Sequence, residues 1–212
     1  MTAVYGIFGA GGHGREIAWL AGLCGIACEE LRFVVDGELA EQAVVNGIPV
    51  LEAADFTRRH PRAPVFVAIG DPHLRRRSAV RLEQAGHCFP SLIADRANLS
   101  PTVQHGGGVI VFPGATVTVD VKLGEHVHVN VNSSISHDVE IGAFTSVSPG
   151  ASICGHVRIG HSVLIGAGAC VINGTERRPL TIGDDAIVGA GACVIGPVPA
   201  GAKVVGVPAR AV

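Results

Sequence analysis

An aliphatic residue occupies every sixth position along the second half of this 212-residue chain. The column runs through Val111, Val117, Leu123, Val129, Ile135, Ile141, Val147, Ile153, Ile159, Ile165 and Val171. Since Val, Ile and Leu make up about a quarter of an average chain, chance fills such a column with a probability of roughly one in a million or less. The chain therefore contains an internal repeat with a period of six residues.

A second column and one interruption accompany the repeat. The positions two residues before the main column hold small or β-branched residues, namely Val109, Ala115, Val121, Val127, Ser133, Val139, Thr145, Ala151, Val157, Val163 and Ala169. The repeat pauses at 173–181 and resumes at Ile182, Val188 and Val194, five residues later than the period requires. We expect this insertion to form a loop that leaves one corner of the repeat structure.

A period of six fits neither the 3.6 residues of a helical turn nor the simple alternation of a strand. It fits a short strand followed by a turn, and three such units complete one triangular coil. The aliphatic column then lies inside the coil, while glycines such as Gly124 and Gly142 let the backbone turn at the corners. A composition with 4% aromatic residues and 29 glycines agrees with an interior too narrow for large rings.

The six-residue repeat resembles that of the hexapeptide-repeat acyltransferases. The resemblance implies a left-handed parallel β-helix and a homotrimer. Left-handedness is an exception to the usual right-handed crossover of parallel strands, so it is carried by the family resemblance and not by the spacing.

Residues 1–90 lack the six-residue repeat and instead alternate apolar runs with segments of helical spacing. This pattern predicts a small Rossmann-like βαβ domain before a β-helical domain at 91–212. An apolar strand at 4–8 leads into a glycine loop at 9–14 and then a helix. Further strands are expected at 31–35, which ends on Asp36, and at 64–69, which ends before Gly70. A helix is expected at 73–85, with Leu74, Val80 and Leu82 on its apolar face.

The glycine loop, Asp36 and Gly70 all follow strands, and ligands of open parallel sheets bind beyond the carboxyl ends of the strands. Gly9, Gly11 and Gly14 spell the G-x-G-x-x-G pattern of dinucleotide sites. A unit of about 90 residues is small for the usual six-stranded dinucleotide domain, so NAD is the less favoured ligand.

A nucleotide diphosphate would bind through the same backbone amides and helix N-terminus, and it needs only one half of a dinucleotide site. Backbone amides of Gly11, Gly12 and Gly14, at the start of a helix, are suited to hold phosphates, and Asp36 is suited to accept hydrogen bonds from a ribose or a base. We expect His13 to bond a phosphate or the base, with capping of the following helix as the structural alternative.

The whole chain, from FGAGGHG at 8–14 to VGVPAR at 205–210, resembles the sialic-acid O-acetyltransferase family, including its nucleotide-linked amino-sugar N-acetyltransferases. The resemblance implies acetyl-CoA as co-substrate and a sugar nucleotide as acceptor. It also identifies 130–138 (NVNSSISHD) as a site segment in which Asn130 contacts substrate, His137 is the general base and Asp138 orients it. Glu140 is the reserve candidate for the orienting carboxylate.

The chemistry explains these residue types. An amine that attacks a thioester must lose a proton, and an imidazole, whose ordinary pKa is about 6.5, accepts one near neutral pH. A neighbouring carboxylate fixes the imidazole tautomer and stabilises the imidazolium. The resemblance also places Gly155 near the thioester, where a backbone amide is suited to stabilise the oxyanion.

The remaining cofactor contacts are implied by the resemblance. Ser146 occupies the position where some relatives carry a second histidine that meets the cofactor. The small residues expected beside the pantetheine are Ala167, Gly189 and Ala190. The cations available for the cofactor phosphates are Arg177, Arg178, Lys203 and Arg210, of which at least two are expected to be solvated surface. The basic run at 75–77 is expected to be a solvated helix face.

The other histidines of the coil, His105, His126, His128, His156 and His161, are expected mostly at solvated corners. Residues 18 apart should stack, and none of these lies 18 residues from another histidine of the coil. The sequence therefore predicts no metal site.

A net charge of −2 gives no indication of nucleic acid or membrane binding, and no signal peptide or membrane-spanning segment is evident. The six cysteines lack paired zinc spacing, which favours buried thiols in a reduced, cytoplasmic protein.

Together these features predict an acetyl-CoA-dependent N-acetyltransferase. Its acceptor would be a nucleotide-diphosphate-linked 4-amino-deoxy-sugar of bacterial glycan synthesis. The alternatives are O-acetylation of sialic acid or a related sugar, transfer of a longer acyl group or to a different amine, and a non-catalytic β-helical nucleotide-binding scaffold.

Overall fold

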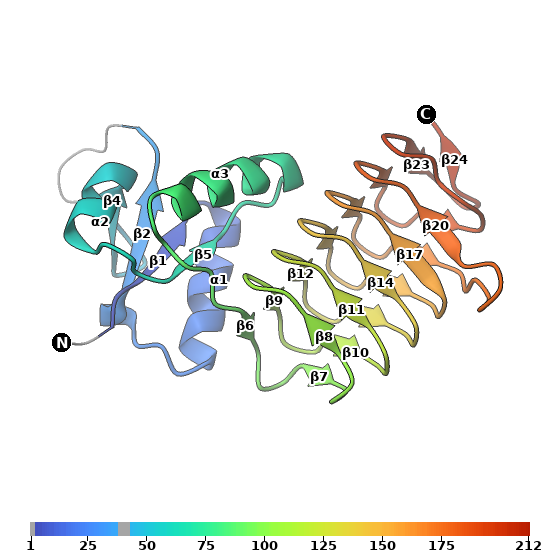
Figure 1. The fold of residues 1–212 in the computed structure, drawn as a ribbon, viewed down its shortest axis with the longest axis horizontal. Helices are drawn as coiled ribbons and strands as arrows, with labels where there is room; N and C mark the ends of the chain where they lie inside the picture. The colour runs from blue at the N-terminus through green and yellow to red at the C-terminus, as the bar shows by residue number, and fades with distance from the viewer. Residues whose placement is uncertain (1–2, 38–42) are drawn as a thin grey trace. The chain divides into compact units, whose positions relative to one another are not determined.

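The computed structural model describes residues 3–37 and 43–212, and the chain divides into two compact units, Met1–Leu92 and Ile93–Val212 (Figure 1). Among the described residues, no helix combines the length and apolar character needed to cross a membrane. Cys28 and Cys88 are exposed thiols, so the expectation that the cysteines are buried is wrong at these two positions.

The first unit is a five-stranded sheet in the order β3-β4-β2-β1-β5, with helices α1, α2 and α3. Its elements are β1 Tyr5–Phe8, α1 Gly12–Leu23, a 3₁₀ turn Cys28–Glu30, β2 Leu31–Val35, β3 Val44–Val45, β4 Ile48–Glu52, α2 Ala53–Arg59, β5 Val65–Val67 and α3 Pro72–Gln84. Strands β4, β2, β1 and β5 are parallel, and β3 pairs antiparallel with β4. The predicted Rossmann-like strand, loop and helix are confirmed.

The apolar face predicted for α3 is partly wrong. Leu82 is buried, but Leu74 and Val80 are nearly half exposed. The buried face instead consists of Pro72, Arg75, Ala79 and Leu82. Helical spacing explains the error, because Val80 and Leu82 are two residues apart and point to opposite sides of a helix.

The second unit is a parallel β-helix, and its coils stack along the unit (Figure 1). Sheet I consists of β6 Leu92–Ile93, β9 Ile110–Val111, β12 His128–Val129, β15 Ser146–Val147, β18 Leu164–Ile165, β21 Ile187–Val188, β23 Lys203–Val205 and β24 Arg210–Ala211. Sheet II consists of β7 Asn98–Leu99, β10 Thr116–Val117, β13 Ser134–Ile135, β16 Ser152–Ile153, β19 Cys170–Val171 and β22 Cys193–Val194. Sheet III consists of β8 Gln104–His105, β11 Lys122–Leu123, β14 Glu140–Ile141, β17 Val157–Ile159 and β20 Leu180–Ile182.

The main aliphatic column faces the interior, as predicted, and the second column is buried as well. Val129, Ile135 and Ile153 are fully buried, and so are their partners in the second column. Adjacent coils pair in register at 18-residue intervals, so Ile135 lies between Val117 and Ile153. Each coil thus covers the apolar edge of its neighbours.

The five-residue insertion leaves the corner between sheets II and III, hereafter corner II–III. Strand β19 ends at Val171 and β20 begins at Leu180, so the loop occupies 172–179. The Gly174 N–H donates to the Gly155 carbonyl at 3.0 Å, which anchors the loop to the preceding coil. The expected corner loop is confirmed.

Candidate active site

His137 and Asp138 lie together at corner II–III. The His137 Nδ1 is 2.8 Å from the Asp138 carboxylate, and both side chains are about half exposed. Asp138 has φ 56°, a left-handed conformation that aspartate tolerates better than most residues. With Nδ1–H donating to the carboxylate, the Nε2 lone pair is left to accept a proton.

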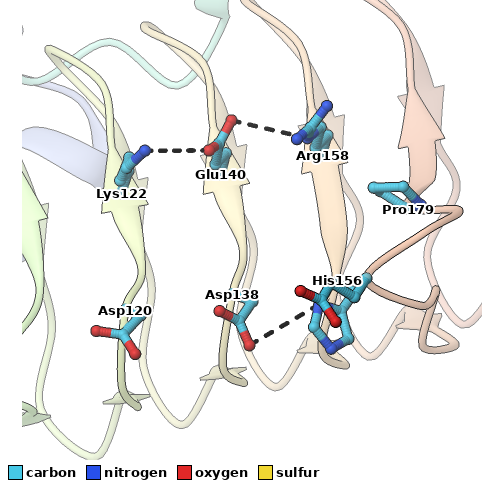
Figure 2. A pocket seen from close by; sticks show the side chains of 8 residues that line it. Asp120, Lys122, Asp138, Glu140, His156, Arg158 and Pro179 are labelled. Carbon is cyan, nitrogen blue, oxygen red and sulfur yellow. Dashed lines mark hydrogen bonds and ion pairs between the residues drawn. The ribbon is translucent and has the colours of Figure 1, made fainter.

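Glu140 is engaged elsewhere. Its carboxylate is 3.2 Å from Lys122 Nζ and 3.9 Å from Arg158 Nε, on the outer face of sheet III (Figure 2). Asp138, and not the reserve candidate Glu140, is therefore the carboxylate within hydrogen-bond distance of His137.

Gly155 lies directly against the His137 ring. A Cβ added at Gly155 would be 2.5 Å from His137 Cε1 and 2.6 Å from Nε2, closer than real Cβ contacts allow. Its φ is not in the left-handed region, so space and not backbone conformation requires glycine here. The Gly155 N–H donates to no described residue, so it is available to donate a hydrogen bond to the oxyanion of a bound substrate.

A cavity of about 510 Å³ opens beside Asp138 (Figure 2). Its lining residues are Asp120, Lys122, Asp138, Glu140, His156, Arg158, Glu176 and Pro179. Glu176 and Pro179 come from the inserted loop, and Figure 2 shows Pro179 near the His156 end of the site. The insertion therefore forms one wall of a cavity that is also lined by Asp138, the partner of the candidate base.

The sequence-based expectation for the other histidines is only partly correct. His105 and His161 are exposed, but His126 and His128 are buried, at 5% and 3% exposure. The His126 ring stacks on Phe144, with centroids 5.0 Å apart. Phe144 lies one coil after His126, and this contact between coils explains why His126 is buried.

The candidate cofactor residues occupy other parts of the coil. Ser146 begins β15 on sheet I, is buried, and lies in one register column with Leu164, Ile187 and Lys203. Ala167, Gly189 and Ala190 follow sheet I strands, at the corner between sheets I and II, and so does the substrate candidate Asn130. Arg210 begins the last strand, β24. Within one chain, sheet II separates this corner from His137, so the structure does not bring the two groups together.

The four candidate cations fall into two pairs. Arg177 and Arg178 lie in the inserted loop at corner II–III, whereas Lys203 and Arg210 lie at the end of sheet I. All four are exposed. One chain therefore does not gather them into a single phosphate site.

The glycine loop of the first unit combines open and crowded positions. A Cβ at Gly11 or Gly12 would meet nothing within 4 Å, whereas one at Gly14 would overlap the Gly9 carbonyl oxygen. Glycine is therefore required at position 14 because the helix and the loop pack too closely there for a side chain. The open, exposed backbone at Gly11 and Gly12 is where an external group can approach.

Gly14→Ala is expected to destabilise the first unit by about 1–3 kcal/mol, because the new methyl group overpacks a backbone contact. Gly11→Ala is the matched control, because its new methyl group meets nothing within 4 Å, and it is expected to cost less than about 1 kcal/mol, the effect of replacing a glycine N-cap. Chemical denaturation of both variants measures the difference. Equal stabilities would contradict the assignment of Gly14 to packing.

His13 and Asp36 already have partners in the chain. His13 lies in the first turn of α1 with Nδ1 3.2 Å from Glu16, and burial lowers its pKa. Gly11 is the N-cap, so the capping role considered for His13 is wrong. The Asp36 carboxylate accepts two hydrogen bonds from Arg81, at 2.7 and 2.8 Å, and the Arg81 guanidinium lies over the Phe8 ring.

The basic run at 75–77 is not a uniform solvated face, because Arg75 is fully buried. Its guanidinium donates to the Ile69 carbonyl at 2.7 Å and to the Gly70 carbonyl at 3.3 Å, and burial lowers its pKa to about 9. Arg75 thus fixes the backbone that follows β5. Arg76 and Arg77 are exposed, as expected.

Comparisons with known proteins cover the whole chain. The PglD N-terminal domain family matches residues 6–82. WeeI from Acinetobacter baumannii AYE is 34% identical with a TM-score of 0.92, and each chain covers 100% of the other. PerB from Caulobacter crescentus, solved with CoA and GDP-perosamine, is 30% identical with a TM-score of 0.88, covering 100% of this chain and 98% of its own.

The acetyltransferase domain of PglB from Neisseria gonorrhoeae FA1090, solved with acetyl coenzyme A, is 31% identical with a TM-score of 0.88, and coverage is 100% of both chains. A search of curated protein sequences finds no significant match.

Proposed function

This chain belongs to the sialic-acid O-acetyltransferase family of hexapeptide-repeat acyltransferases, and from that premise we propose that it transfers acetyl from acetyl-CoA to the amine of a nucleotide-diphosphate-linked 4-amino-deoxy-sugar. It is an acyltransferase with a Rossmann-like first unit and a left-handed parallel β-helix. The observation that carries the proposal is the His137 imidazole, which Asp138 orients and which lies against Gly155. Asp138 also lines a cavity.

The reaction is a direct transfer. The neutral amine attacks the thioester carbon, the new C–N bond forms, and His137 Nε2 accepts the proton that the nitrogen loses. The Gly155 N–H donates a hydrogen bond to the oxyanion of the tetrahedral intermediate. As the C–S bond breaks, the imidazolium returns its proton to the departing thiolate, and Asp138 stabilises the imidazolium in between.

The first unit holds the sugar nucleotide in this proposal. Gly11 and Gly12 present open backbone at the start of α1, where the helix dipole favours a phosphate. Asp36 follows β2, at the position of a ribose or base, and is held by Arg81 of α3, while Gly70 follows β5. His13 and Asn130 are the further substrate contacts that we assign.

The cofactor site lies between subunits of a homotrimer in this proposal. Small residues at Ala167 and Ala190 leave room for a pantetheine chain, and Lys203 and Arg210 supply charge for its phosphates. Because these residues and Ser146 lie away from His137 within one chain, a second copy is needed to complete the site. Sedimentation at micromolar concentration is expected to show a trimer, and a stable monomer would contradict this arrangement.

A thiol-release assay with acetyl-CoA tests the function. We expect release with one nucleotide-linked 4-amino-sugar from a panel that varies the nucleotide (UDP, GDP and dTDP) and the sugar. The matched control is the same sugar nucleotide with hydroxyl in place of amine, which should give no release. Thiol release only with sialic acid would show O-acetylation instead. No thiol release with any acceptor would favour a non-catalytic scaffold.

A further inference from the structure

Two imidazoles share the Asp138 carboxylate. His137 Nδ1 is 2.8 Å and His156 Nδ1 3.8 Å from the same oxygen, and the two rings meet edge to face with centroids 5.1 Å apart. One ligand atom from each of the three residues lies within 4.8 Å of the others. The proposed reaction uses His137 and Asp138 and gives His156 no role.

The fold brings the third residue in from the next coil. Asp138 and His156 are 18 residues apart and both adopt left-handed corner conformations, with φ 56° and 55°. Figure 2 shows the two side chains facing each other across neighbouring coils. The His156 N–H also donates to the His137 carbonyl at 3.2 Å, which fixes the two coils together at this point.

These distances are close to those of a first coordination shell. Zn²⁺ binds histidine nitrogen and carboxylate oxygen at about 2.0–2.2 Å, which puts neighbouring tetrahedral ligands roughly 3.3–3.6 Å apart. The observed separations of 2.8 and 3.8 Å from the shared carboxylate oxygen lie on either side of that range, and all three ligand atoms lie within 4.8 Å of one another, so side-chain rotations are what remains to complete the ligand set. Two imidazoles and one carboxylate favour Zn²⁺, Cu²⁺ or Ni²⁺ over Mg²⁺ or Ca²⁺.

The surrounding charge also favours a cation. The cavity beside the cluster is lined by four carboxylates, including those of Asp120 and Glu176, and by only two basic side chains, Lys122 and Arg158. Both basic groups are paired with Glu140 on the face of sheet III (Figure 2). The charged side chains that line the cavity, with histidine neutral, thus sum to −2.

We propose that His137, Asp138 and His156 bind one divalent transition-metal ion such as Zn²⁺, with water in the fourth position. A ligated His137 cannot accept a proton from the acceptor amine, so metal binding inhibits acetyl transfer. The binding itself needs no catalytic assignment, and only the inhibition rests on the proposed function.

Binding is tested by equilibrium dialysis of the full chain against Zn²⁺ alone. The matched variants are His156→Asn, which removes one ligand, and His105→Asn, which removes an exposed histidine elsewhere in the coil. We expect one ion per chain to be lost or bound at least roughly tenfold more weakly in His156→Asn. His105→Asn should bind as the unchanged chain does. Equal binding by all three proteins, or no binding, would overturn the site.

A spectroscopic signal gives a second readout. Co²⁺ in a tetrahedral nitrogen and oxygen site absorbs visible light, so titration with Co²⁺ is expected to produce a band in the unchanged chain that is absent in His156→Asn. The same band in both proteins would place the ion at other ligands and overturn the site.

Inhibition is tested in the thiol-release assay, with each protein compared with its own metal-free rate. Zn²⁺ is expected to inhibit the unchanged chain, a chelator to restore it, and His156→Asn to need roughly tenfold more Zn²⁺ for the same inhibition. Equal sensitivity would overturn the inhibitory role. If no acceptor is turned over by the metal-free chain, it is the proposed function that fails, and dialysis alone decides the metal site.

Discussion

His137→Asn is expected to lower kcat by about 10²- to 10⁴-fold, the range that a positioned general base contributes. Asparagine keeps much of the side-chain volume but accepts no proton at neutral pH. Since His137 is half exposed, and its ring is not part of the apolar core, folding should be unaffected. The measurement is steady-state kinetics with the acceptor identified by the thiol-release assay.

His105→Asn is the matched control, because this exposed histidine also lies in the coil but outside the site. Its kcat should equal that of the unchanged chain. Calorimetric titration with CoA and with the sugar nucleotide should show that His137→Asn still binds both. If His137→Asn retains full turnover, another group is the base and the mechanism proposed here is wrong.

Gly155→Ala is expected to lower kcat by about 10²-fold, because a displacement of roughly 1 Å of a reacting group has an effect of this size. The new methyl group would lie 2.5 Å from His137 Cε1, so the ring must move away from its position beside Asp138. The backbone of Gly155 is not left-handed, so alanine is compatible with its conformation. Kinetics and thermal unfolding of the variant separate loss of activity from loss of fold.

Gly196→Ala controls for adding a methyl group to a coil glycine, because a Cβ at Gly196 would meet nothing within 4 Å. It should match the unchanged chain in both activity and melting temperature. If Gly155→Ala is as active as Gly196→Ala, the close contact between Gly155 and the His137 ring does not affect turnover.

The β-helix was predictable from the sequence because its determinants are local and repeated. Each hexad encodes the same strand and turn, and in-register stacking follows once one coil is defined, so Ile135 and Ile153 were assigned to the core correctly. His137 and Asp138 are adjacent in the chain, and their contact required only a correct rotamer. The stacking of Gly155 beneath His137 follows from their 18-residue separation.

Other features depend on contacts that no local pattern encodes. The Asp36–Arg81 pair joins positions 45 residues apart, and the burial of Arg75 depends on carbonyl groups exposed where β5 ends. His156 was missed because 18-residue stacking was considered only between histidines, whereas the residue 18 positions before His156 is the carboxylate Asp138. Corner side chains also meet diagonally, as His137 and His156 do at a separation of 19 residues.

The short elements between β2 and β5 also have no hydrophobic periodicity from which they could have been predicted. Strand β4 contains a proline, and α2 has only seven residues, too few for a helical period to be recognised.

In the proposed reaction, an acetyl group moves from acetyl-CoA to a sugar nitrogen. The most direct test uses acetyl-CoA labelled with ¹³C in the acetyl carbonyl and locates the label by NMR in the purified product. We expect an amide, with the labelled carbonyl bonded to the nitrogen of the amino-sugar. A labelled ester on a sugar oxygen would contradict it.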